Sequence, residues 1–104
     1  MSRPIGLLAP TALCPDPLVT AVSMGLERPQ QYERLIDGGS EWRWLEPVSP
    51  GEQLWQIARI IDQEERTSTR HRSATTVFEI RTWNEQGRLV AVARARSVSY
   101  EETK

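Results

Sequence analysis

The sequence predicts an α+β fold in which one short helix packs on an antiparallel β-sheet. Prolines break the first third of the chain and leave room for only one helix. After Gly38 and Gly39, apolar and polar residues alternate, as they do in strands with one buried face. The segment Asn84–Gly87 predicts a tight turn between two such strands. A length of 104 residues with 38% apolar residues fits a single domain.

The predicted helix spans Pro17–Leu26. Asp16 is a good N-cap, proline is favoured at the first helical position, and Gly25 ends the run. The apolar stripe would consist of Leu18, Val22 and Met24 or Leu26, with Ala21 beside it. A second, weaker helical turn is predicted over Gln30–Leu35. One alternative stays open for the helix start: it would lie near Pro10, with kinks at Pro15 and Pro17.

Four strands are predicted after the two glycines, joined by short connections that favour antiparallel neighbours. They are Ser40–Glu46, Glu52–Arg66, Ala74–Asn84 and Arg88–Tyr100. The first places Trp42 and Trp44 on one face. The second is apolar on both faces near its start, which predicts a strand covered on both sides. The segment Thr67–Ser73 is predicted to be a polar, basic connection.

Three alanines, Ala91, Ala93 and Ala95, share one face of the last predicted strand. Small side chains at a spacing of two residues allow another element to pack unusually close. The helix is one candidate for that element, and a neighbouring subunit is another.

Composition excludes several classes of protein. The single cysteine, Cys14, excludes an internal disulfide framework and a zinc site built from several cysteines, and it has no basic neighbour to activate it as a nucleophile. No apolar run is long enough for a membrane helix and no signal pattern opens the chain, so the expected compartment is the cytoplasm. The net charge of −1 gives no electrostatic case for binding nucleic acid or a membrane. Lys104 is the one lysine among 13 basic residues, which reflects either coding bias or use of arginine for anions and interfaces.

The segment 38–51 (GGSEWRWLEPVSPG) resembles a glycine- and proline-containing segment of MaoC-like dehydratases, especially their N-terminal-domain type. The segments Gly6–Thr11 (GLLAPT) and 84–92 (NEQGRLVAV) are similar to that family as well, so that the resemblance covers roughly residues 5–100. It implies a hot-dog fold, in which a curved antiparallel sheet of four or five strands wraps around one central helix. The implied domain spans residues 1–104, with the option of a shortened N-terminus.

The resemblance also implies a function with acyl thioesters of coenzyme A or of a carrier protein. The family's Asp-x-Asn-Pro-x-His hydratase motif has no counterpart in this sequence. We therefore expect a hot-dog subunit of an enoyl-thioester hydratase or dehydratase that is non-catalytic by itself. It would complete a substrate tunnel in a homodimer, or in a heterodimer with a catalytic MaoC-domain protein. The alternatives are a stand-alone hot-dog thioesterase or degenerate dehydratase, and a non-enzymatic binding or structural module. No metal or cofactor is expected, apart from the coenzyme A thioester as substrate or ligand.

Six residues are candidates for the site. His71 is the sole histidine and hence the one candidate general base, although a loop histidine is more often simply exposed. The substrate and coenzyme A candidates are Arg66, Arg70, Arg72, Trp42 and Trp44. Guanidinium groups match phosphate oxygens, so the arginines would hold the phosphates of coenzyme A unless they form an ordinary solvated loop. The tryptophans would line an acyl channel unless they belong to the core or to an interface.

Overall fold

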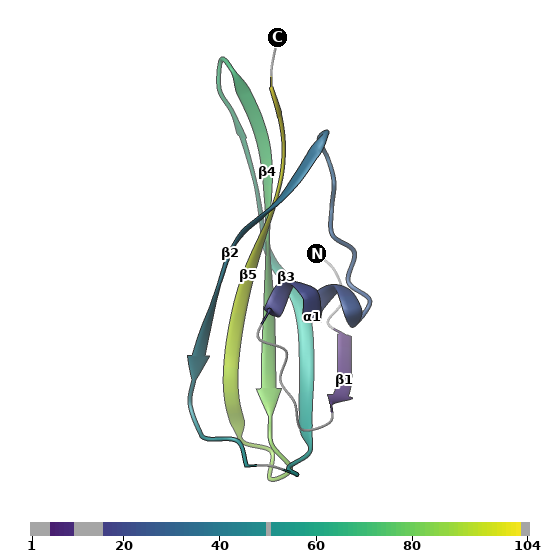
Figure 1. Ribbon diagram of the computed structural model, residues 1–104, viewed down its shortest axis with the longest axis vertical. Coiled ribbons are helices and arrows are strands. Elements are labelled where there is room, and N and C mark those ends of the chain that lie inside the picture. The colour runs from purple at the N-terminus through teal and green to yellow at the C-terminus, as the bar shows by residue number, and fades with distance from the viewer. Residues whose placement is uncertain (1–4, 10–15, 50, 103–104) are drawn as a thin grey trace.

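The computed structural model describes residues 5–9, 16–49 and 51–102. Its elements follow the order β1 (Ile5–Ala9), α1 (Pro17–Ser23), β2 (Arg34–Trp44), β3 (Leu54–Thr67), β4 (His71–Trp83) and β5 (Leu89–Glu102). The five strands form one antiparallel sheet in the order β1-β3-β4-β5-β2, and α1 lies across one face (Figure 1). The predicted α+β class, with one helix on an antiparallel sheet, is confirmed.

Helix α1 begins as predicted and ends earlier. The side chain of Asp16 accepts hydrogen bonds from the backbone nitrogens of Leu18 and Val19, and Pro17 occupies the first turn. The helix ends after seven residues, so Met24 and Leu26 reach the sheet from the segment that follows it. Val22 was expected in the apolar stripe but is 44% exposed. Val22 lies inside the helix, but the buried face of α1 is formed by Pro17, Leu18, Thr20 and Ala21.

Strand β2 is longer than predicted. It begins at Arg34, so the helical turn predicted over Gln30–Leu35 is wrong. It also runs through the two glycines that were expected to separate the helical part from the strands. They form a β-bulge, in which the pairing with β5 shifts between Asp37 and Ser40. Gly39 has a φ of 103° there, a conformation that glycine adopts at little cost.

Strand β1 pairs with the first part of β3 and lies before the helix, whereas the sequence predicted no strand there.

Strand β3 is covered on one face only, contrary to the prediction. Leu54, Ala58 and Ile60 are buried, whereas Trp55 on the other face is 46% exposed.

Both tight turns between the long strands are hairpins. The backbone nitrogen of Gly87 donates to the carbonyl of Asn84 at 3.0 Å, and Gly87 has a φ of 79°, as predicted for this turn. The connection predicted over Thr67–Ser73 is shorter, because β3 continues to Thr67 and β4 begins at His71. Figure 1 shows this β3–β4 hairpin extending far beyond α1, which gives the molecule a longest dimension of 53 Å.

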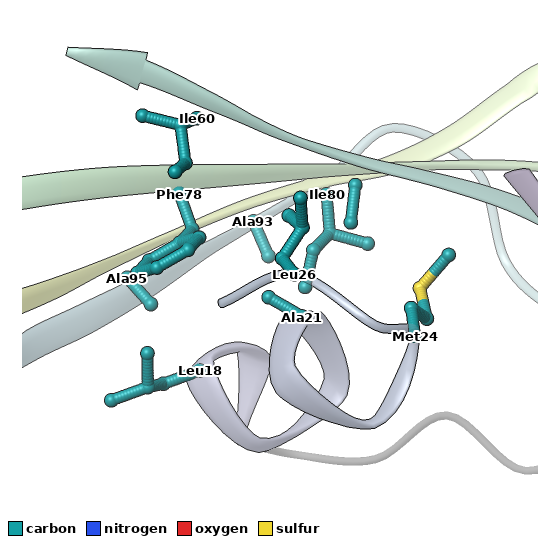
Figure 2. Close-up of a cluster of buried hydrophobic side chains, with 10 residues drawn as sticks. Leu18, Ala21, Met24, Leu26, Ile60, Phe78, Ile80, Ala93 and Ala95 are labelled. Atoms are coloured by element: carbon teal, nitrogen blue, oxygen red, sulfur yellow. The ribbon is translucent and has the colours of Figure 1, made fainter. Parts of the chain in front are cut away.

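The core lies between α1 and the centre of the sheet. Leu18 and Ala21 of the helix, with Met24 and Leu26, face apolar side chains of the three central strands (Figure 2). The sheet contributes Ala58, Ile60, Phe78, Ile80, Ala93 and Ala95. The alanines on β5 are completely buried, and the helix is the element that packs against Ala93 and Ala95. We call this side of the sheet the helix face and the opposite side the outer face.

Some predictions fall on residues outside the described ranges. They concern Cys14 and the alternative helix start near Pro10. Within the described ranges, no helix combines the length and the apolar character needed to cross a membrane.

Candidate functional site

Trp42 and Trp44 lie on the helix face of β2, close to its C-terminal end. Their rings are stacked, with centroids 5.1 Å apart and planes 12° from parallel. In the sheet register they stand opposite Ala93 and Ala91 of β5. Trp42 packs against the buried core, whereas Trp44 is 54% exposed. The two rings therefore form a ledge that joins the core to the open edge of the sheet.

The three arginines predicted to hold phosphates lie around the tip of the β3–β4 hairpin. Arg72 stands opposite Thr67 and Arg66 stands opposite Ser73. Because residues directly opposite share a face and successive residues alternate, Arg66 and Arg72 project from opposite faces. The structure therefore does not bring these two guanidinium groups together within one copy.

Two of these arginines already have partners. The Nε atom of Arg66 donates to Glu64 at 3.0 Å. Arg72 donates to Glu101 at 2.9 Å and lies over the ring of Tyr32. The hydrogen bond with Glu101, and then the charge of that carboxylate, raises the pKa of Arg72. Arg70 is exposed at the hairpin tip, and its guanidinium has no partner among the described residues.

His71 is the first residue of β4 and stands opposite Glu102 on β5. It is exposed, and its backbone carbonyl closes the hairpin by accepting a hydrogen bond from the nitrogen of Ser68 at 2.7 Å. None of the three aspartates, all of them described, lies beside it. Asp16 caps the helix, Asp37 accepts a hydrogen bond from Gly39, and Asp62 stands opposite Val77, six residues along β4 from His71. Among the described residues, no three histidine, cysteine or carboxylate side chains gather to hold a metal ion.

The predicted tryptophan and arginine groups lie at opposite ends of the sheet. Trp42 stands level with Ile80 of β4 through Ala93, and Arg72 lies eight residues before Ile80 on the same strand. At the usual rise of a strand the two positions are about 26 Å apart. One copy therefore cannot join the tryptophan ledge and the hairpin arginines in one compact pocket.

A different charged group on the outer face was not predicted. Glu79 on β4 is only 3% exposed although it lies on the face opposite the helix. Arg81 donates to its carboxylate at 2.8 Å, and Arg59 and Arg94 approach it at 3.4 Å. The three guanidinium groups cover the carboxylate and remain nearly half exposed themselves.

Arg81 and Arg94 also belong to a second arrangement, which we call the arginine triangle: Arg43, Arg81 and Arg94 around Val92. Val92 stands directly opposite Arg81 on one side and Arg43 on the other, and Arg94 follows it by two residues on the same face. Arg43 is exposed, and its guanidinium has no partner among the described residues.

The triangle lies in a hollow of about 530 Å³ on the outer face. Its lining residues are Glu41, Trp42, Arg43, Leu45, Glu79, Arg81, Leu89, Val92 and Arg94, most of them charged or aliphatic. Leu45 and Leu89 lie toward the end of the sheet, beyond Val92. The hollow thus has charged groups, three arginines and two glutamates, at one end and aliphatic side chains at the other.

The sequence does contain a signal for this group. In Phe78-Glu79-Ile80-Arg81-Thr82 every second residue is charged, and β5 repeats the pattern with Arg94 and Arg96 between alanines and a serine. Charged residues at a spacing of two lie on one strand face. Which of them become neighbours depends on the register between strands, and the sequence does not determine that register.

Comparison with known proteins places the chain in no family: neither a protein-family model nor a curated protein matches it.

Proposed function

We propose that this protein is a hot-dog subunit related to MaoC-like dehydratases that has no catalytic pair of its own. In this proposal it completes a tunnel for an acyl thioester of coenzyme A or of a carrier protein together with a second hot-dog chain. The architecture supports the proposal, since a helix lies on one face of a five-stranded antiparallel sheet in the order β1-β3-β4-β5-β2. The helix, of seven residues, is shorter than the predicted Pro17–Leu26.

The lack of a catalytic pair in the described residues supports a non-catalytic role. Hydration of an enoyl thioester needs groups that add a water molecule and manage its protons. Helix α1 (PLVTAVS) carries no ionisable side chain. The described aspartates and His71 do not converge: Asp16 lies at the helix start, and His71 lies at the far hairpin.

The exposure of Trp44 is the observation that carries the proposal. An indole that is 54% exposed beside buried alanines forms one wall of a binding surface and lacks the opposite wall. It lies on β2, which among the described residues pairs only with β5 and has its other edge open. Open edges of this length are usually paired or protected in native proteins. A second chain at this edge would supply both the missing strand partner and the missing wall.

Pairing of two β2 edges would also bring the separated halves of the predicted site together. A two-fold axis across β2 makes the two edge strands antiparallel, so the Trp44 end of one copy lies beside the Arg34 end of the other. Arg34 stands opposite Tyr100, close to the hairpin that carries Arg70 and Arg72. In such a dimer the tryptophans come from one copy and the phosphate-binding arginines from the other. The same geometry holds for a heterodimer with a related catalytic chain.

The test combines sedimentation with a binding assay. The purified chain, of 11.9 kDa as a monomer, should sediment as a dimer at micromolar concentration and should bind crotonyl-CoA without hydrating it. Trp44→Gln should weaken dimerisation by at least about tenfold, as expected for an interface tryptophan. Trp55→Gln is the matched control, since Trp55 is 46% exposed but lies on the outer face, and it should leave dimerisation unchanged.

The other outcomes separate the alternatives. Hydration or hydrolysis of the thioester by the chain alone would support the stand-alone enzyme and overturn the non-catalytic subunit. A monomer that binds no thioester, alone or with a catalytic MaoC-domain protein, would support the structural module. Equal effects of the two tryptophan variants would remove the β2 edge from the proposal.

A further inference from the structure

We propose that the arginine triangle on the outer face is a binding site for a small molecule that carries a phosphate group on an apolar body. This site lies on the face of the sheet opposite the helix and the tryptophan ledge. It is therefore additional to the thioester tunnel and does not depend on it.

The first argument is that two of the three triangle cations, Arg81 and Arg94, are held in position before a ligand binds. Glu79, only 3% exposed, fixes Arg81 through a 2.8 Å contact and Arg94 through a 3.4 Å contact. A guanidinium has five N–H donors, and the bonds to Glu79 leave donors free on both side chains. Both side chains remain nearly half exposed. A ligand therefore meets donors that are already oriented, which lowers the entropic cost of binding.

The second argument is the balance of charge. Three arginines of the lining, Arg43, Arg81 and Arg94, stand against two carboxylates, Glu41 and Glu79, and Arg59 and Arg96 pair with these carboxylates from outside the lining. This part of the outer face therefore carries a net charge of +3 in a chain whose net charge is −1. A phosphate monoester carries a charge of about −1.5 to −2 at neutral pH and offers three acceptor oxygens. It would offset most of this excess and give each of the three triangle arginines an oxygen.

The third argument is the shape and polarity of the hollow. Its volume of about 530 Å³ lies within the usual range for small-molecule sites. Val92 forms the floor between the arginines, and Leu45 and Leu89 continue the surface away from them. A phosphate over Val92 would leave the rest of the molecule lying on these aliphatic side chains. This polarity favours an ester with an apolar group over inorganic phosphate.

The test uses phenyl phosphate, inorganic phosphate and phenol in titrations followed by NMR or calorimetry. Phenyl phosphate should bind saturably and more tightly than inorganic phosphate, and phenol should not bind. Arg43→Gln should weaken the binding of phenyl phosphate by about tenfold, the effect expected for the loss of one charge-assisted hydrogen bond. Because Arg43 is exposed and has no partner among the described residues, this substitution should leave the fold intact.

Arg88→Gln is the matched control, since it removes one exposed positive charge from a side chain that does not line the hollow and should leave the affinity unchanged. Equal losses in the two variants would show a general charge effect and overturn the proposal, as would unchanged binding in Arg43→Gln. A phospholipid headgroup offers the same chemistry as a free phosphate ester. Co-sedimentation of the protein with phosphatidic acid vesicles, lost in Arg43→Gln, would overturn the small-molecule assignment in favour of a lipid surface.

Discussion

Arg81 donates a hydrogen bond of 2.8 Å from its Nε atom to the carboxylate of Glu79, on the face of the sheet that the helix leaves open. Both residues belong to β4 and are separated by one residue, so their side chains leave the same face of the strand. Glu79 is buried there by charged neighbours, because Arg59 and Arg94 approach it from the strands on either side. One carboxylate thus keeps three like charges close together.

Replacing Glu79 by glutamine should destabilise the protein. The amide has nearly the shape of the carboxylate but no charge, so the three arginines repel one another without compensation. We expect the free energy of unfolding to fall by about 1–3 kcal/mol, the range for lost hydrogen bonds to charged groups, with solvent screening favouring the lower end. Urea unfolding at low and high salt measures the loss, which should shrink as salt screens the repulsion.

Glu64→Gln provides the control for that measurement. Glu64 also pairs with an arginine at 3.0 Å, but both side chains are exposed, at 55% and 79%. Exposed pairs of this kind contribute about 0–1 kcal/mol. Equal destabilisation in the two variants would contradict the importance assigned to burial of Glu79.

The helix cap gives a second prediction. Asp16 accepts hydrogen bonds from Leu18 at 3.0 Å and Val19 at 3.4 Å, and α1 has only seven residues. Helices this short depend on caps and tertiary contacts for their stability. Asp16→Ala should lower the free energy of unfolding by about 1 kcal/mol. Asp16→Asn should keep most of the stabilisation that the cap provides. Thermal unfolding followed by circular dichroism measures both, and an alanine variant as stable as the asparagine variant would contradict the capping role.

The success of the helix prediction and the failure at β2 have different physical origins. Asp16 and Pro17 act within one turn, so the sequence around them was sufficient to place the helix start. Gly38 and Gly39 are tolerated inside a strand because β5 supplies the pairing on both sides of the bulge. A bulge depends on the partner strand, and two glycines in the sequence alone are equally typical of a turn.

The candidate site shows the same limit. The shared face of Trp42 and Trp44 follows from alternation within one strand and is found in the structure. The grouping of Arg66 with Arg72 assumed a loop, whereas the strands continue nearly to the hairpin tip and alternate the two side chains between faces. The group around Glu79 requires the register of three strands at once. Long-range register is the part of the structure that local patterns do not determine.

Gly38 tests the packing of the bulge. A Cβ atom at this position would lie 3.0 Å from the Cβ of Arg96 and 3.0 Å from a methyl group of Val98. The Arg96 contact is with an atom fixed to the backbone, so β2 must move. Gly38→Ala should therefore cost about 1–3 kcal/mol through overpacking. Adding Val98→Ala removes one of the two contacts and should recover part of the loss, so strictly additive effects in a double-mutant cycle would contradict the contact.

Ala93 tests how closely the helix and the tryptophan ledge pack on β5. It is completely buried, stands opposite Ile80 on one side and Trp42 on the other, and belongs to the core under α1. Ala93→Leu inserts three carbon atoms into this space and should lower the free energy of unfolding by about 1–3 kcal/mol. Urea unfolding measures the change.

The volume argument can be separated from other effects of a leucine on this strand. Combining Ala93→Leu with Ile80→Ala exchanges a large and a small side chain between directly opposed positions, so the total volume stays nearly constant. The double variant should be more stable than either single variant, because Ile80→Ala alone leaves a cavity in the core. Val92→Leu is the control on the neighbouring, outer-face position, which is only partly buried and should tolerate the larger side chain. Full stability of Ala93→Leu would mean that α1 and Trp42 can move away from β5, and the close packing on the alanines would then not be a constraint on the fold.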